Sequence, residues 1–133
     1  MAGVDPMYIR FVSPWRCVRA RAETGLFGPA YSAARAASVE PWMRAEIRRS
    51  LDWFSLHLAV PWDLSRCGRN GVCWFRDQAG RHVSEARYLA WLIGEAGLPI
   101  AELRMDRPGT VIWQDDHQVV ALPERNHPRL FAR

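Results

Sequence analysis

The chain has 133 residues, 49% of them hydrophobic and 24% charged, which is the size and composition of one globular domain and not of a disordered chain. All 18 basic residues are arginines and the net charge is +4, but this charge is spread out, so it indicates only a modest preference for anionic partners. The odd number of cysteines, the absence of a signal-like N-terminus and the lack of a membrane-spanning apolar stretch predict a soluble, cytoplasmic protein that does not bind a membrane.

The N-terminal half of the chain predicts one strand followed by two helices. Apolar residues alternate over residues 7–12, which is typical of a strand with one buried face, and residues 15–24 are expected to form a loop. Residues 25–37 are rich in alanine and predict a helix, and Ser38 is expected to cap a second helix that ends near residue 58. The buried stripe of that second helix should contain Met43, Ile47, Leu51, Phe54 and Leu58.

The C-terminal half predicts a strand, a third helix and three further strands. The apolar run of residues 71–76 is typical of a central strand, and Asp77 is expected to cap a helix that stops at Gly97. Asp115 and Asp116 suit the turn of a final hairpin. The three last strands are expected at residues 100–105, 110–114 and 117–122.

This order, β-α-α-β-α-β-β-β, predicts an α+β fold in a single globular domain over residues 1–133, with residues 124–133 as a loosely docked C-terminal tail. Residues 72–105 have the form of a parallel crossover unit, whereas the last hairpin is antiparallel. We therefore expect a mixed sheet of about five strands with the helices mainly on one face. One core is expected to contain Ile9, Phe11, Phe54, Phe75, Leu89, Ile93 and Leu103.

Six short segments along the chain resemble a group of small, uncharacterised bacterial proteins. They are Arg10-Phe11-Val12, Gly25-Leu26-Phe27, Trp53-Phe54, Cys73-Trp74-Phe75-Arg76, Arg107-Pro108-Gly109 and Gln118-Val119-Val120. The resemblance implies a bacterial origin and no particular chemistry, because no activity is established for that group.

The sequence contains no recognisable metal, phosphate-binding or nucleophile motif, so no metal or cofactor is expected and a non-enzymatic protein is favoured. Cys67 and Cys73 are six residues apart, which fits no common metal site. Cys73 lies within an apolar run and is expected to be a buried core thiol. We expect Cys17 and the other two cysteines to be free and structural.

Trp91 lies on the polar side of the third predicted helix, beside Arg87 and Tyr88. The opposite side of this helix already supplies the apolar stripe that would pack on the sheet. Tryptophan, tyrosine and arginine are the residue types that dominate protein contacts. We therefore expect Trp91, Arg87 and Tyr88 to contact a protein partner or a second copy of the chain, unless the other helices or the tail cover the indole.

A second candidate surface is one face of the predicted sheet, which carries arginine and aromatic side chains. Such a face could hold phosphates and stack on bases, so RNA or single-stranded nucleic acid is a possible partner. A solvated face with Arg–Glu pairs across strands explains the same pattern. The residues of this face are Tyr8, Arg10, Trp74, Arg76 and Arg104, with Glu102 among them.

A third candidate is a ligand crevice around Arg76 and His82, which would suit a small enzyme or a ligand-binding protein. His82 falls on the apolar side of the third helix, near its start, and would point inward. Ligands in open sheets with crossover helices bind at the carboxyl ends of the strands. The side chains that would converge there are Arg76, Asp77, His82, Arg104 and Asp106. The alternative is that His82 is a structural residue and Asp77 only a helix cap.

Overall fold

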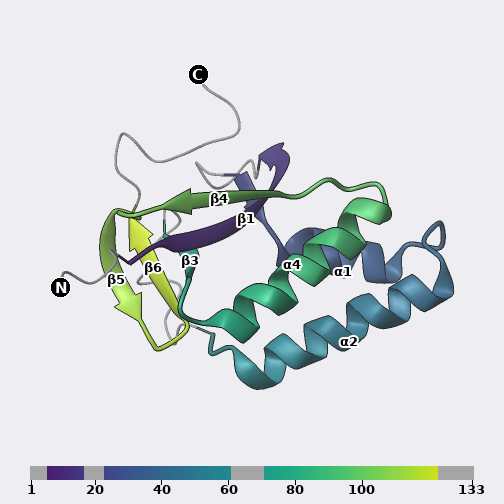
Figure 1. Ribbon diagram of the computed structural model, residues 1–133. Helices are drawn as coiled ribbons and strands as arrows, with labels where there is room; N and C mark the ends of the chain where they lie inside the picture. The colour runs from purple at the N-terminus through teal and green to yellow at the C-terminus, as the bar shows by residue number, and fades with distance from the viewer. Residues whose placement is uncertain (1–5, 17–22, 61–70, 123–133) are drawn as a thin grey trace.

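The computed structural model describes residues 6–16, 23–60 and 71–122, which form three helices and six strands (Figure 1). The helices are α1 (Phe27–Arg35), α2 (Pro41–His57) and α4 (Gly80–Glu95). The strands are β1 (Tyr8–Arg16), β2 (Glu23–Gly25), β3 (Val72–Arg76), β4 (Ala101–Met105), β5 (Thr110–Gln114) and β6 (Gln118–Leu122). The α+β class is confirmed, while the tail expected at residues 124–133 lies outside the described residues.

β1 is a central strand of the sheet although it comes first in the sequence. One of its edges pairs with β4, from Tyr8 opposite Met105 to Val12 opposite Ala101. Its other edge pairs first with β3 and then with β2, and β3 continues the sheet to β6 and β5. All of these pairs are antiparallel, so the described sheet is antiparallel and not mixed. β3 and β4 do run parallel to each other, as a crossover unit requires, but β1 lies between them.

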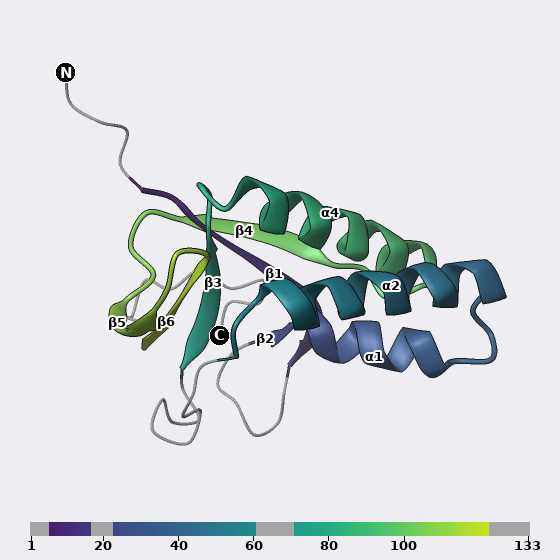
Figure 2. The ribbon, with the colours of Figure 1, turned by 90° about the horizontal axis from the view of Figure 1, so that it is seen from below.

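Side chains alternate between the two faces of the sheet, and each face has its own apolar cluster. Ile9, Phe11 and Phe75 belong to the main core, which they share with residues of the helices. Figures 1 and 2 show the described helices together on that side of the sheet, next to β1 and β4. The second cluster contains Val72, Trp74 and Val119, with Tyr8, Leu103 and Met105 packed against them. The expectation of one core is therefore wrong for Leu103, while the other six residues named for it do lie in the main core.

α2 packs through the apolar stripe that its sequence predicts. The stripe residues that it buries are Met43, Ile47, Leu51 and Phe54. Pro41 occupies the first turn, where its missing N–H costs no hydrogen bond. The helix therefore begins after Glu40, so the expected cap at Ser38 is wrong.

α4 begins later than its sequence suggests. The backbone N–H of Asp77 donates a 3.0 Å hydrogen bond to the carbonyl of Met7, which keeps this residue attached to the sheet. Helical geometry starts only at Gly80, preceded by Ala79, so Asp77 is not the helix cap. The other end agrees with the prediction, because Gly97 has a φ of 98° and provides the left-handed turn that ends the helix.

The strands also differ from the prediction at residues 15–24, which were expected to form a loop and which contain the end of β1 and the start of β2. β1 continues through Ser13 and Pro14 to Arg16, where it pairs with β2 in an irregular register. Proline is tolerated there because a bulge does not require its missing N–H. The hairpin of β5 and β6 agrees with the prediction, since Asp115 Oδ1 accepts 2.9 Å hydrogen bonds from the backbone N–H groups of His117 and Gln118.

Candidate protein-contact surface

α4 carries an exposed tryptophan opposite its packed side. The residues that the helix buries are His82, Val83, Ala86, Leu89, Leu92 and Ile93. Trp91 lies on the other side, with 53% of its surface exposed. The buried residues anchor the helix without this indole, so Trp91 contributes little to the packing of α4 on the sheet.

α2 and α4 are joined by hydrogen bonds between their side chains. Tyr88 Oη donates a 2.7 Å bond to Glu46 Oε1. Ser50 Oγ donates a 3.0 Å bond to Glu85 Oε2. Residue numbers therefore rise along one helix while they fall along the other, which makes the two helices antiparallel.

A second exposed tryptophan follows from this arrangement. Trp42 is 55% exposed and lies one turn before Glu46 on α2. Trp91 lies one turn after Tyr88 on α4, and in an antiparallel pair both steps lead toward the same end. The two tryptophans therefore lie at the same end of the helix pair, one turn beyond the contact between Glu46 and Tyr88. We call the set Trp42, Glu46, Arg49, Tyr88 and Trp91 the α2–α4 aromatic surface.

Charges hold the rings of this surface in place. The hydrogen bond from Tyr88 lowers the pKa of the Glu46 carboxyl, and the nearby charge of Arg49 lowers it further. The same bond raises the pKa of the Tyr88 hydroxyl. The Arg49 guanidinium lies over the Tyr88 ring at 5.7 Å, and the ring of Trp91 stacks on Tyr88 with centroids 6.1 Å apart. Tyr88 is thus fixed by contacts with both helices, and Trp91 lies against it.

Arg87 was predicted to belong to the same contact surface as Trp91 and Tyr88, but it has a different role. Its guanidinium forms hydrogen bonds of 2.9 and 3.1 Å with the Glu102 carboxylate, which links α4 to β4. These contacts lower the pKa of Glu102, with a smaller effect from Arg104 at 3.1 Å. Trp91 borders the groove of about 380 Å³ that this pair helps to line. Arg87 therefore braces the edge of the aromatic surface.

The residues proposed for a nucleic-acid face do not form one open surface. Arg104 lies opposite Ile9 and therefore projects from the helix side of the sheet, away from Tyr8. Trp74 is only 1% exposed and Arg10 8% exposed, so neither ring nor guanidinium is available for stacking on bases. Tyr8 and Trp74 instead belong to the apolar cluster of that face.

The side chains proposed for a ligand crevice are mostly engaged with the protein itself. Arg76 donates hydrogen bonds to the carbonyl of Asp115, at 2.8 Å, and to the side chain of Gln114. These bonds direct it toward the β5–β6 turn. Arg104 lies on β4, separated from β3 by β1. Asp106 follows β4 and is exposed, and Asp77 extends the sheet as described above.

His82 is part of a cluster of stacked rings that joins three segments. Its Nε2 donates a 2.7 Å hydrogen bond to the carbonyl of His57 at the end of α2. Its ring stacks on His117 of the hairpin at 4.0 Å and lies against Trp53 at 5.0 Å. Trp53 in turn stacks on His57 at 4.4 Å. These contacts support the interpretation of His82 as a structural residue over its interpretation as part of a ligand crevice.

Cys73 is exposed on the helix side of β3, so the expectation of a buried core thiol is wrong. Its parity matches that of Phe75, and it lines the cavities on this side of β3 without being covered by the described helices. Cys17 and Cys67 lie outside the described residues. Within residues 6–16, 23–60 and 71–122, no group of three or more histidine, cysteine or acidic side chains could hold a metal ion.

Sequence reasoning missed Trp42, Glu46 and Arg49 as members of the α2–α4 aromatic surface. The signal was present, because these residues follow one another at steps of four and three on one side of the second helix. The sequence could not show which face of α4 packs next to this face of α2.

Comparisons of the chain with protein-family models, with curated proteins and with solved structures found no significant match. No helix in the part of the chain that the structure describes is long and apolar enough to cross a membrane.

Proposed function

We propose that the protein is a non-enzymatic binding module that contacts another protein through the α2–α4 aromatic surface. The observation that carries the proposal is the pair of tryptophans, each more than half exposed, at the same end of the α2–α4 pair, next to the contact between Tyr88 and Glu46. An indole in water forfeits roughly 2–3 kcal/mol that burial could provide. Both tryptophans lie at one end of the helix pair, so a single partner that covers both rings would recover this free energy twice.

The chemistry of the partner follows from the charges around the rings. Arg49 forms ion pairs with Glu46 and Glu85, and Arg87 with Glu102. These charged groups are thus neutralised within the chain. The matching surface of the partner should be apolar and only weakly charged, and its association should depend little on salt, unlike binding to nucleic acid.

Photo-crosslinking from the proposed surface tests this function. A benzophenone amino acid would replace Trp91 or Trp42 in cells that make the protein natively, with Arg35 on α1 as an exposed control position. We expect one discrete adduct from both tryptophan positions and none from Arg35. Equal crosslinking from all three positions, or none from the tryptophans, would contradict the proposal.

The affinity for the crosslinked partner should then fall when the rings are removed. Trp91→Ala should weaken association at least tenfold, about 1.4 kcal/mol, while the melting temperature stays nearly unchanged. Leu56→Ala is the matched control, because this side chain is also exposed on α2 but lies at the other end of the helix. Sedimentation equilibrium of the purified chain distinguishes a second copy from a different protein. Unfolding of Trp91→Ala would show instead that the indole is needed for the fold.

A further inference from the structure

The sheet contains a wedge where two central strands separate. β1 and β3 pair at only two positions, Tyr8 opposite Arg76 and Ile9 opposite Phe75. Beyond these positions β2 takes the place of β3, since Val12 pairs with Gly25. β3 therefore diverges from β1, and a cavity of about 320 Å³ lies between them.

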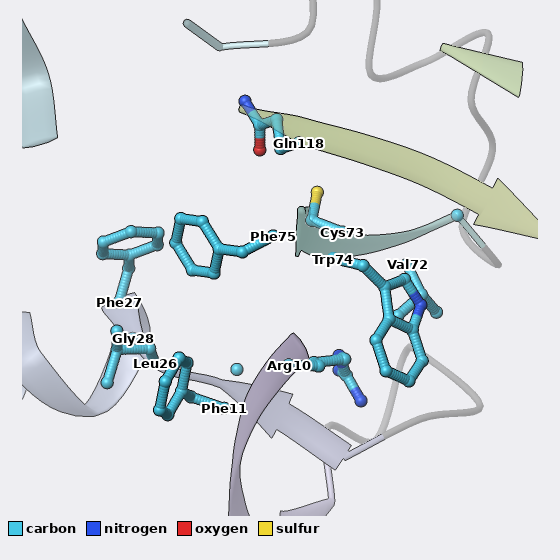
Figure 3. Close-up of a pocket in the computed structure, with 12 residues that line it drawn as sticks. Arg10, Phe11, Leu26, Phe27, Gly28, Val72, Cys73, Trp74, Phe75 and Gln118 are labelled. Atoms are coloured by element: carbon cyan, nitrogen blue, oxygen red, sulfur yellow. The ribbon is translucent and has the colours of Figure 1, made fainter. Parts of the chain in front are cut away.

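The two sides of this cavity differ in chemistry. Figure 3 shows Phe11, Phe27 and Phe75 on one side of the open space. The side chains of Arg10 and Trp74 extend to the other side. The wall is thus apolar on the side of the helices and carries a buried guanidinium on the opposite side, because Arg10 belongs to the other face of the sheet.

The apolar side continues into a second cavity. This space, of about 260 Å³, lies between α1, the end of α2 and the sheet. It shares Phe27, Cys73 and Gln118 with the first cavity, so the two meet at these residues. Leu58 and Val60 are among its other lining residues. The two cavities thus adjoin, and Arg10 lines the first of them.

Binding sites for small molecules occupy roughly 300–1,000 Å³, and the first cavity alone reaches the lower end of this range. A cation in a largely apolar wall favours a ligand with one negative group, since charge-assisted hydrogen bonds to carboxylates are strong. A guanidinium has five N–H donors, so Arg10 can keep its present contacts and still bind a carboxylate.

We propose that this wedge binds an amphipathic carboxylate of the fatty-acid type, with its carboxylate at Arg10 and its apolar chain passing Cys73. The site is separate from the α2–α4 aromatic surface and uses none of its residues. It gives the module a small-molecule ligand in addition to its protein partner, and either proposal can fail without the other.

Displacement of a fluorescent probe tests the site in the full chain. A dansyl-labelled fatty acid is bound first and then displaced by dodecanoate or by dodecanol, which has the same chain without the charge. For the wild-type protein, dodecanoate should displace the probe at a concentration at least tenfold lower than dodecanol. No binding of the probe, or equal displacement by the two compounds, would overturn the proposal.

Two pairs of variants locate the ligand. Cys73→Phe fills the junction of the cavities and should reduce probe binding at least tenfold, whereas Cys73→Ala leaves the space open and should bind normally. In Arg10→Met, dodecanoate should displace the probe only at the higher concentration that dodecanol requires. Arg104→Met, which removes an exposed arginine on the other face, should have no effect.

The outcome is decisive even if Arg10→Met does not fold, as judged by circular dichroism. The comparison of dodecanoate with dodecanol on the wild-type protein then tests the charge, and the two Cys73 variants test the location. Binding by Cys73→Phe as tight as by Cys73→Ala would show that the probe binds elsewhere, and the proposal would be wrong.

Discussion

The two faces of the sheet protect their apolar residues in different ways. On the helix side, Ile9, Phe11 and Phe75 pack beneath three amphipathic helices, and the main core contains residues from all of them. On the opposite face, the cluster around Trp74 is built from strand residues alone, within the described part of the chain. A helix covers a sheet with a whole stripe of side chains, whereas strand residues can only pack against their neighbours on the same face. The helix side should therefore carry most of the stability.

Substitution of leucine in the main core should have the largest effect. Leu89 is fully buried on α4, so Leu89→Ala leaves a cavity that the surrounding helices cannot close. We expect the free energy of unfolding to fall by about 2–5 kcal/mol. Urea denaturation followed by circular dichroism measures this change. A loss below about 1 kcal/mol would mean that the helix layer is more loosely packed than its contacts indicate.

The same substitution on the other face should cost less. Leu103 is only partly buried and packs against the small cluster, so Leu103→Ala should lower the free energy of unfolding by about 1 kcal/mol. The denaturation experiment is the same, and an unchanged slope with urea is its control. Equal losses for the two leucines would refute the difference between the faces.

The smallest expected effect concerns the ion pair at the edge of the helix side. Arg87 holds the pKa of Glu102 below its ordinary value, so the pair stabilises the fold above about pH 4.3 and loses this effect as the pH falls through the lowered pKa. Arg87→Met should raise that pKa toward its ordinary value. Because Arg87 is half exposed, the loss of stability at neutral pH should stay below about 1 kcal/mol.

An NMR titration of the Glu102 side-chain carboxyl measures this pKa in both proteins. Arg49→Met is the matched control, since it removes an arginine that does not contact Glu102. A pKa of Glu102 that does not change in Arg87→Met would show that the pair is not formed in solution.

The sequence predicted the helices and the strand periods, because both depend on local patterns. In β4, apolar and charged residues alternate clearly, and the alternation correctly separates Leu103 from Glu102 and Arg104. It could not show which set faces the helices, because a shift of one residue exchanges the two faces. Pairing with β1 decides this, and it places Glu102 within reach of Arg87.

The candidate surface was predictable only in part, for a similar reason. Trp91 could be placed on the polar side of its helix from the sequence alone. Trp42, at the same end of the helix pair, comes from a helix far away in the chain, and the register between α2 and α4 depends on tertiary contacts such as the bond from Tyr88 to Glu46. The wedge beside Arg10 was unpredictable in the same way, because it results from the exchange of β3 for β2 along one edge of β1.

The central position of β1 has a consequence for the making of the protein. A ribosome releases β1 first, but two of its three partner strands, β3 and β4, follow at residues 72–76 and 101–105. Only β2 is close enough in the sequence to pair early. Until Met105 has emerged, the nascent chain exposes an apolar strand with much of its hydrogen-bonding edge unfilled, which is the kind of segment that aggregates and that chaperones bind. Translation speed and chaperone supply should therefore change the yield of folded protein, while the stability of the protein that has folded stays the same.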